Sequence, residues 1–139
     1  MVWLLVLRKS PAKFPVYLDL SGFNFTQSDV NEVLVKSLYR CEFTQGSQNI
    51  VFVGRPGTGN LHLATAIGVQ AIQQHQLRVR FLSTVELVNV LEQEKMDGKA
   101  GRIANRLISA YLVNLDELGH LPFTIYHLPN MAENYCSIY

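Results

Sequence analysis

The segment over residues 49–75 constrains the fold more than any other part of the chain. It begins with an unbroken apolar run, Asn49–Val53, and continues into a glycine-rich loop, Gly54–Gly59. Apolar side chains then recur at helical spacing to about residue 75. A short apolar run that ends in glycine is typical of a buried parallel strand, so the segment predicts a strand, a tight turn and a helix packed on a sheet. Gly57 and Gly59 let the turn direct backbone N–H groups inward, where the positive end of the helix adds to them.

This order of strand, loop and helix matches the P-loop pattern G-x-x-x-x-G-K-[ST], which binds nucleotide phosphates. Two positions depart from it chemically. Asn60 stands at the lysine position and carries no charge for the β- and γ-phosphates, and Leu61 stands at the Ser/Thr position and offers no oxygen to magnesium. The backbone amides remain, so the loop predicts weak phosphate binding and impaired hydrolysis.

An apolar strand that ends in two carboxylates forms a second signature. Residues 111–115 are predicted as a strand, and Asp116 and Glu117 follow it. After a P-loop this pattern is typical of a Walker B motif, in which the aspartate helps to hold magnesium and the glutamate polarises the attacking water. Without the P-loop, the two carboxylates would be read as the cap of the next turn. Asn114 lies within this strand and needs a partner, because a buried unpaired amide costs about 1–3 kcal/mol.

Strand and helix patterns alternate along the rest of the chain, which predicts a parallel, doubly wound α/β sheet in one domain. A helix is predicted to open at Ser28-Asp29, with Asp29 and Glu32 in its first turn, and to stop at Gly46. A strand is predicted over 78–82, followed by a helix that begins with a capping box at 83–86. A short helix over 102–109 is predicted after a break at Gly98 and Gly101.

The composition is that of a globular chain. Of the 139 residues 48% are apolar and 17% charged, and a net charge of +1 gives no bulk electrostatic argument for nucleic acid or membrane as a partner. Cys41 and Cys136 lack metal or redox spacing and predict reduced thiols in an intracellular protein. The apolar run over residues 2–7 is too short to span a membrane, and its cations follow it. It predicts a short strand or helix docked on the body, or a frayed end.

With both signatures placed, the chain resembles the IstB family, AAA+ ATPase helpers of insertion-sequence transposases that are similar to DnaC helicase loaders. The resemblance runs from about residue 12 to residue 124. Its most specific stretch, residues 116–123, reads D-E-L-G-H-L-P-F, where the family has D-E-L-G-Y-L-P-F. The family loop normally reads G-P-P-G-T-G-K-T-H-L-A, so Arg55 and the pair Asn60-Leu61 are departures, while residues 62–64 are kept.

The resemblance implies a three-layer AAA+ P-loop NTPase core that uses ATP and magnesium. It implies an ATP-binding, cytoplasmic protein of an insertion sequence that helps DNA transposition, with DNA, a transposase and further copies of itself as partners and no membrane. Catalysis would fall to Glu117 and magnesium to Asp116. The nucleotide would be bound by Gly54, Pro56, Gly57, Thr58, Gly59, Asn60, Leu61 and His62.

The resemblance stops at Thr124 and divides the chain into three parts: an N-terminal extension or linker (1–25), a partial AAA+ P-loop domain (26–124) and a divergent tail (125–139). The AAA+ sheet has the strand order 5-1-4-3-2, and the chain is expected to be C-terminally truncated before strands 4 and 5. A gap would then open between the P-loop strand and the Walker B strand. Either these two strands pair directly, or the tail fills the gap, or the domain is only marginally stable.

Four basic residues leave a further choice open. Lys95, Lys99, Arg102 and Arg106 surround the glycine break, and they are either DNA phosphate contacts or a solvated helix face. Three functions therefore remain: a nucleotide-binding transposition helper that is an ATPase by ancestry, a non-catalytic module that binds DNA or other subunits, and a decayed fragment without activity.

Overall fold

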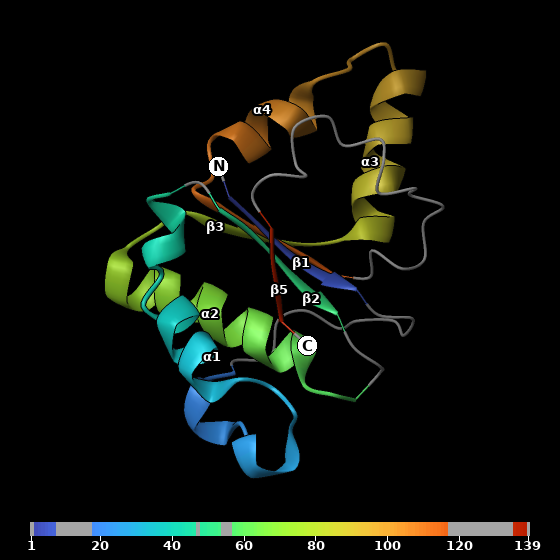
Figure 1. The fold of residues 1–139 in the computed structure, drawn as a ribbon. Helices are drawn as coiled ribbons and strands as arrows, with labels where there is room; N and C mark the ends of the chain where they lie inside the picture. Colours follow the sequence, from blue (N-terminus) through green and yellow to red (C-terminus); the bar gives the residue numbers. More distant parts are fainter. Residues whose placement is uncertain (1, 8–17, 47, 54–56, 117–134, 139) are drawn as a thin grey trace.

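The protein is built on a parallel sheet with helices on both faces (Figure 1). The computed structural model describes residues 2–7, 18–46, 48–53, 57–116 and 135–138. Helices α1 (Glu32–Tyr39) and α2 (Asn60–His75) lie on one face, and α3 (Thr84–Met96) and α4 (Arg102–Ile108) lie on the other. This arrangement confirms the predicted parallel α/β sheet between two helix layers.

The sheet has five parallel strands in the order β3-β4-β1-β2-β5. The strands are β1 (Val2–Leu7), β2 (Asn49–Val53), β3 (Val79–Ser83), β4 (Leu112–Asp116) and β5 (Tyr135–Ile138). The strands predicted over 49–53, 78–82 and 111–115 are β2, β3 and β4, each placed within one residue. Their apolar runs are long enough to locate them without knowledge of their neighbours.

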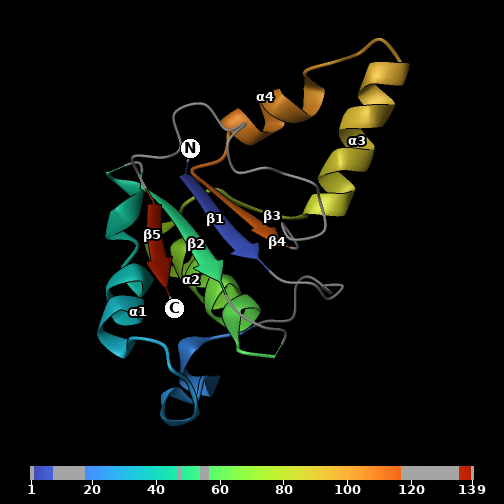
Figure 2. The same cartoon turned by 45° about the vertical axis from the view of Figure 1, so that its right-hand side comes forward.

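Strand β1 lies in the middle of the sheet, between β2 and β4 (Figure 2). Leu4 pairs with Ile50 of β2 on one side and with Asn114 of β4 on the other. The sequence predicts a gap at this position that is closed by direct pairing or by the tail, or that leaves the domain only marginally stable; the stability itself stays a prediction. Neither direct pairing nor closure by the tail occurs: the N-terminal strand fills the gap, and the tail contributes β5 on the outer side of β2. With a neighbour on each edge, β1 can pair backbone groups on both sides, so no strand edge is left open in the middle of the sheet.

Residues 2–7 therefore belong to the sheet, although they lie within the predicted extension 1–25. The other domain boundaries, at residues 26 and 124, stay predictions. Within the part of the chain that the structure describes, no helix is both long enough and apolar enough to cross a membrane.

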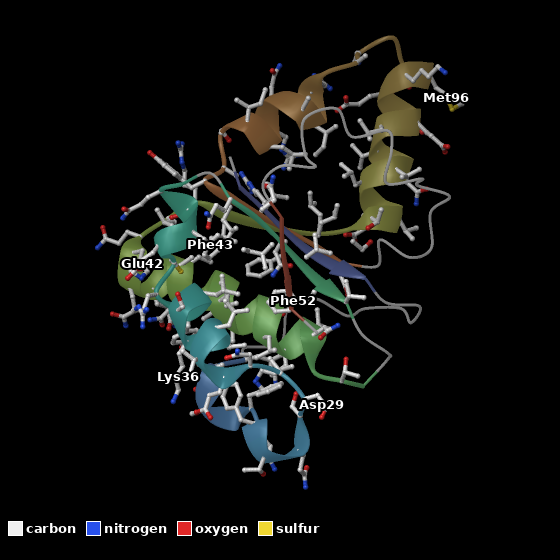
Figure 3. The ribbon with its side chains drawn as sticks, viewed as in Figure 1. Asp29, Lys36, Glu42, Phe43, Phe52 and Met96 are labelled. Atoms are coloured by element: carbon white, nitrogen blue, oxygen red, sulfur yellow. The ribbon has the colours of Figure 1, made fainter. Side chains whose placement is uncertain are left out.

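Helix α1 is shorter than predicted at both ends. The Asn31 side chain accepts a hydrogen bond from Leu34 N at 3.0 Å and caps the helix, so Asp29 lies before it rather than in its first turn (Figure 3). At the other end Cys41 has a φ of 59°, which no continuing helix can accommodate. The helix thus stops before Gly46, and a 3-10 turn (Glu42–Thr44) takes its place.

The main core lies between α2 and the sheet. Leu63, Ala64 and Ile67 of α2 are fully buried in one cluster with Ile50 and Phe52 of β2. Phe52 is labelled in Figure 3. The apolar residues whose helical spacing predicts α2 therefore lie on the side of the helix that packs on the strands. This packing fixes the start of α2 near the carboxyl ends of the strands.

A second, smaller core lies under α4, where Ile103, Leu107, Ala110 and Val113 are buried together. Successive residues of β4 serve opposite faces of the sheet: Val113 joins this cluster, and Leu112 joins the core under α2. Asn114 faces α2, and its Nδ2 donates to Ala64 O at 2.9 Å.

The predicted capping box is confirmed at the start of α3. Ser83 Oγ accepts from Glu86 N at 3.0 Å, and Glu86 Oε2 accepts from Ser83 N at 3.3 Å. The predicted glycine break is also confirmed, since Gly98 and Gly101 both have positive φ between α3 and α4.

Candidate functional site

The candidate site lies at the carboxyl edge of the sheet. There β2 leads into the glycine-rich loop and α2, and β4 ends at Asp116 (Figure 1). Parallel strands present their carboxyl ends at the same edge, which is where open α/β sheets bind ligands. Residues 54–56 and Glu117 lie outside the described residues, so the predicted roles of Gly54, Pro56 and Glu117 stay predictions.

The described part of the loop, from Gly57 onward, has the conformation that its glycines predict. Gly57 and Gly59 have φ values of 84° and 90°, a region that other residues rarely adopt. Gly59 is the N-cap of α2: its carbonyl accepts from Leu63 N at 2.9 Å, and no described side chain caps the helix. The first N–H groups of α2 therefore follow an N-cap that has no side chain of its own to accept their hydrogen bonds, as in an anion-binding helix start.

Asn60 is the first residue of α2 and is only 7% exposed. Its Nδ2 is a buried donor with no hydrogen-bond partner among the described residues. Because the surrounding atoms cover Nδ2, a phosphate group would be bound here by the backbone N–H groups of the helix start rather than by this amide. The residues present therefore fit the phosphates of a nucleotide, although without the positive charge that the P-loop pattern supplies.

The same residues do not fit the magnesium ion of a P-loop. Leu61, half-buried at the second position of α2, carries no oxygen in its side chain. Asp116 is fully buried at the end of β4, and its backbone carbonyl accepts a hydrogen bond from Thr84 Oγ1. Within the described ranges, no group of three or more His, Cys, Asp and Glu residues is placed to hold a metal. One carboxylate is thus the only described part of the predicted magnesium site.

His62 is held by the segment before α1. Its Nε2 lies 2.7 Å from Asp19 O, and because a carbonyl can only accept, Nε2 carries the proton. The Asp19 side chain accepts from Ser21 Oγ at 2.6 Å and from Gly22 N at 3.1 Å. The hydrogen bond from Ser21 has the largest effect and the one from Gly22 the next, and together they hold the pKa of Asp19 below its usual value. His62 therefore fastens this segment to the start of α2, whereas its predicted contact with nucleotide stays a prediction.

Phe23 lies against the loop, although it is not among the residues predicted to bind the nucleotide. Its ring packs edge-to-face on His62, with 5.5 Å between ring centroids, and on Phe25 at 4.8 Å. A Cβ placed on Gly59 would lie 2.4 Å from Phe23 Cε2. The ring therefore forms a wall of the loop, and Gly59 is required both by its φ and by this contact. The sequence favours ordinary core aromatics at residues 23 and 25, and the family resemblance implies that this region packs near the adenine. Only the structure shows the contact between Phe23 and Gly59.

Comparison with known proteins places the chain in a family. The family model described as "IstB-like ATP binding protein" matches residues 6–129, which is most of the chain. The chain belongs to this family. It is 34% identical to the "Insertion sequence IS21 putative ATP-binding protein" of Pseudomonas aeruginosa over 83% of the chain and 43% of that protein. It is 32% identical to the IS5376 protein of the same description from Geobacillus stearothermophilus, over 79% of the chain and 44% of that relative. The chain thus spans less than half the length of these relatives.

A second candidate site lies along α3 and α4, away from the loop. Lys99, Arg102 and Arg106 line one hollow. A neighbouring hollow at the edge of the sheet shares Arg106 and adds Arg80 of β3. We call these two hollows the basic groove. Lys95, the fourth predicted residue, is not among the side chains that line it.

The acidic side chains of the basic groove are engaged elsewhere. Glu94 is buried, and its carboxylate accepts from the backbone N–H groups of Gly101, Arg102 and Ile103 at 3.1, 3.1 and 2.6 Å. Asp97 accepts from Gln93, and Glu86 belongs to the capping box. Both ion pairs found in the described chain lie at α1 and the turn after it, so the cations of the groove are not neutralised by them.

Proposed function

We propose that this member of the family is a nucleotide-binding helper of DNA transposition in which the loop holds nucleotide phosphates but hydrolyses ATP poorly or not at all. Its partners are DNA, a transposase and further copies of the chain, in the cytoplasm. The observation that carries the proposal is the start of α2: two glycines at positive φ lead directly into the N-terminus of a helix whose N-cap is a glycine without a side chain.

The chemistry of the loop separates binding from hydrolysis. Backbone N–H groups bind phosphate whatever the side chains are, so binding survives the replacement of the lysine. Phosphoryl transfer depends on positioned charge. Magnesium–ATP, when bound, would supply a phosphoryl group for transfer to water. Asn60 and Leu61 remove the cation and the magnesium ligand that would stabilise the charge of that transfer.

The test compares the natural chain with the double variant Asn60→Lys/Leu61→Thr, which restores the family loop. Fluorescent ATP is titrated in the presence of magnesium, and phosphate release is measured in parallel. We expect weak binding and negligible turnover for the natural chain, and affinity at least about tenfold higher for the double variant, because a charged hydrogen bond contributes about 1.5–3 kcal/mol. ATP turnover by the natural chain would contradict impaired hydrolysis, and the absence of binding in both proteins would contradict the nucleotide function itself.

The basic groove supports a second candidate function, DNA binding without catalysis. Four cations, Arg80, Lys99, Arg102 and Arg106, lie along it on exposed positions, and the acids that line it are held by their own hydrogen bonds. Cations that form no ion pair among the described residues suit the phosphates of a nucleic acid backbone, which bind by releasing counterions.

This second function is tested by the salt dependence of DNA binding without nucleotide. We expect Arg102→Gln/Arg106→Gln to lower the slope of log K against log salt by about 2, because each arginine neutralises about one phosphate. Lys95→Gln is the matched control, since this lysine is exposed near the same turn but does not line the groove. Equal slopes for the double variant and the control would show that the two arginines do not contact DNA phosphates and belong to a solvated helix face.

A further inference from the structure

We propose that Glu94 is a positioning residue for DNA binding: its carboxylate holds the turn between α3 and α4 and thereby presents the cations of the basic groove to DNA together. The cations concerned are Lys99, Arg102 and Arg106. This inference rests on the second candidate function proposed above and names the residue that sets the geometry of the groove. It predicts that loss of a negative charge from the groove weakens DNA binding, whereas charge repulsion alone predicts the opposite.

The Glu94 carboxylate binds backbone rather than a cation. The residue is 9% exposed, and its carboxylate accepts hydrogen bonds from the N–H groups of Gly101, Arg102 and Ile103 at 3.1, 3.1 and 2.6 Å. Neither of the ion pairs found among the described residues includes it. A buried carboxylate without a cation is costly unless hydrogen bonds replace its water, so these three bonds stabilise Glu94 in its buried position.

Helix α4 needs the same bonds, because a helix start leaves its first N–H groups without partners inside the helix. The N-cap of α4 is Gly101, which has a φ of 100° and makes no side-chain hydrogen bond. The helix has only 7 residues, a length at which a helix is not stable by itself. Glu94 of α3, seven positions before Gly101, therefore supplies the acceptor that the start of α4 lacks.

The cations of the groove follow directly from this fixed turn (Figure 1). Lys99 lies in the turn, and its N–H donates to the backbone carbonyl of Glu94 at 2.9 Å. Arg102 is the first residue of α4 and donates its N–H to the Glu94 carboxylate, and Arg106 comes one helical turn later. All three side chains are exposed, and they line one hollow together with Glu94. Glu94 thus fixes the backbone from which these cations extend.

Asp97 provides a matched acid in the same hollow. It is exposed, and its carboxylate accepts from Gln93 Nε2 at 2.9 Å. Gln93 and Asp97 both belong to the end of α3, so this bond does not reach α4. Neutralising Asp97 therefore removes the same charge as neutralising Glu94 and leaves the start of α4 in place.

The experiment measures binding of a fluorescein-labelled DNA duplex to the full chain, without nucleotide, over a range of salt concentrations. The natural chain is compared with Glu94→Gln and Asp97→Asn, which each remove one negative charge at nearly constant volume. The amide of Glu94→Gln keeps one acceptor oxygen but turns a donor towards backbone N–H groups, so the three bonds cannot all be kept.

We expect Glu94→Gln to bind the duplex about tenfold more weakly. Its slope of log K against log salt should be smaller by about 1–2, because one or two phosphate contacts are lost. Asp97→Asn should bind as tightly as the natural chain or up to about threefold more tightly, with the same slope, since it only removes repulsion.

A double-mutant cycle separates positioning from a loss of folding. In the Arg102→Gln/Arg106→Gln background, Glu94→Gln should weaken DNA binding little further, because the side chains that it positions are already removed. A partly unfolded protein would instead bind more weakly in both backgrounds. Glu94→Asp is a second variant with unchanged net charge, and it ends one carbon short of the N–H groups. It should therefore also weaken binding, by about threefold or more.

The inference is overturned if Glu94→Gln binds DNA as tightly as the natural chain or more tightly, or if it weakens binding equally in both backgrounds. Should Glu94→Gln not fold, equal affinity of Glu94→Asp and the natural chain overturns it. In these cases DNA binding by the groove still stands. If the natural chain binds no DNA, or if Arg102→Gln/Arg106→Gln leaves its salt slope unchanged, the second candidate function is wrong and the inference falls with it.

Discussion

Replacing Gly59 by alanine tests how the loop is held against the segment before α1. The new Cβ would lie 2.4 Å from Phe23 Cε2, and Gly59 has a φ of 90°. An alanine in the left-handed region costs roughly 1–2 kcal/mol, and overpacking a filled site costs a further 1–3 kcal/mol or so. We therefore expect Gly59→Ala to lower the free energy of unfolding by about 2–5 kcal/mol, a large part of the usual 5–15 kcal/mol.

Gly57→Ala is the matched control. Its φ of 84° carries the same backbone penalty, but nothing lies within 4 Å of the added Cβ, so we expect a loss of only about 1–2 kcal/mol. The difference between the two variants isolates the contact with Phe23. Urea unfolding is followed by circular dichroism and by the fluorescence of Trp3, the single tryptophan, which lies in β1.

The clash is assigned to Phe23 by a double-mutant cycle. Phe23→Leu replaces the ring by a smaller side chain that leaves room for the added Cβ. The double variant Phe23→Leu/Gly59→Ala should therefore be about 1–2 kcal/mol more stable than the sum of the single changes predicts. Equal losses for Gly57→Ala and Gly59→Ala, or additive effects in the cycle, would refute the packing of Phe23 on the loop. The loss at each glycine would then reflect backbone conformation alone.

Three further perturbations have defined outcomes. Leu5→Pro places a proline in the central strand β1, between β2 and β4, and should cost about 3 kcal/mol or more, measured as a lower urea midpoint; an unchanged midpoint would argue against the central position. Glu94→Ala removes the acceptor of three backbone N–H groups and should cost about 2–3 kcal/mol, whereas Glu92→Ala, an exposed change on the same helix, should stay within about 0.5 kcal/mol in the same measurement. Burial raises the pKa of the Cys41 thiol to about 11 from 9.0, so native protein should react slowly with a thiol reagent at pH 8. Because the folded-state pKa is the higher one, the contribution of this thiol to stability is complete below about pH 9 and is lost as the pH rises towards 11, which pH-dependent unfolding would detect.

The features of the site that could be read from the sequence are local ones. A glycine that needs positive φ, a capping box and an apolar run each depend on residues a few positions apart, and all three were located correctly at Gly59, Ser83 and β2. The predicted start of α1 was wrong for a reason that is also local. Ser28 and Asn31 both offer a cap, and only the side chain of Asn31 takes the hydrogen bond from the third residue of the helix.

The amino-acid sequence by itself thus determined the strand, the glycine turn and the helix of the loop, together with the two residues that change its chemistry, Asn60 and Leu61. Only the tertiary structure decided that β1 stands between β2 and β4, that Phe23 lies on Gly59 and that Arg80 joins Arg106 in one groove. The physical reason is sequence distance. An apolar strand is equally suited to any position in a parallel sheet, so its place is chosen by which distant backbone edges remain unpaired when the chain has folded.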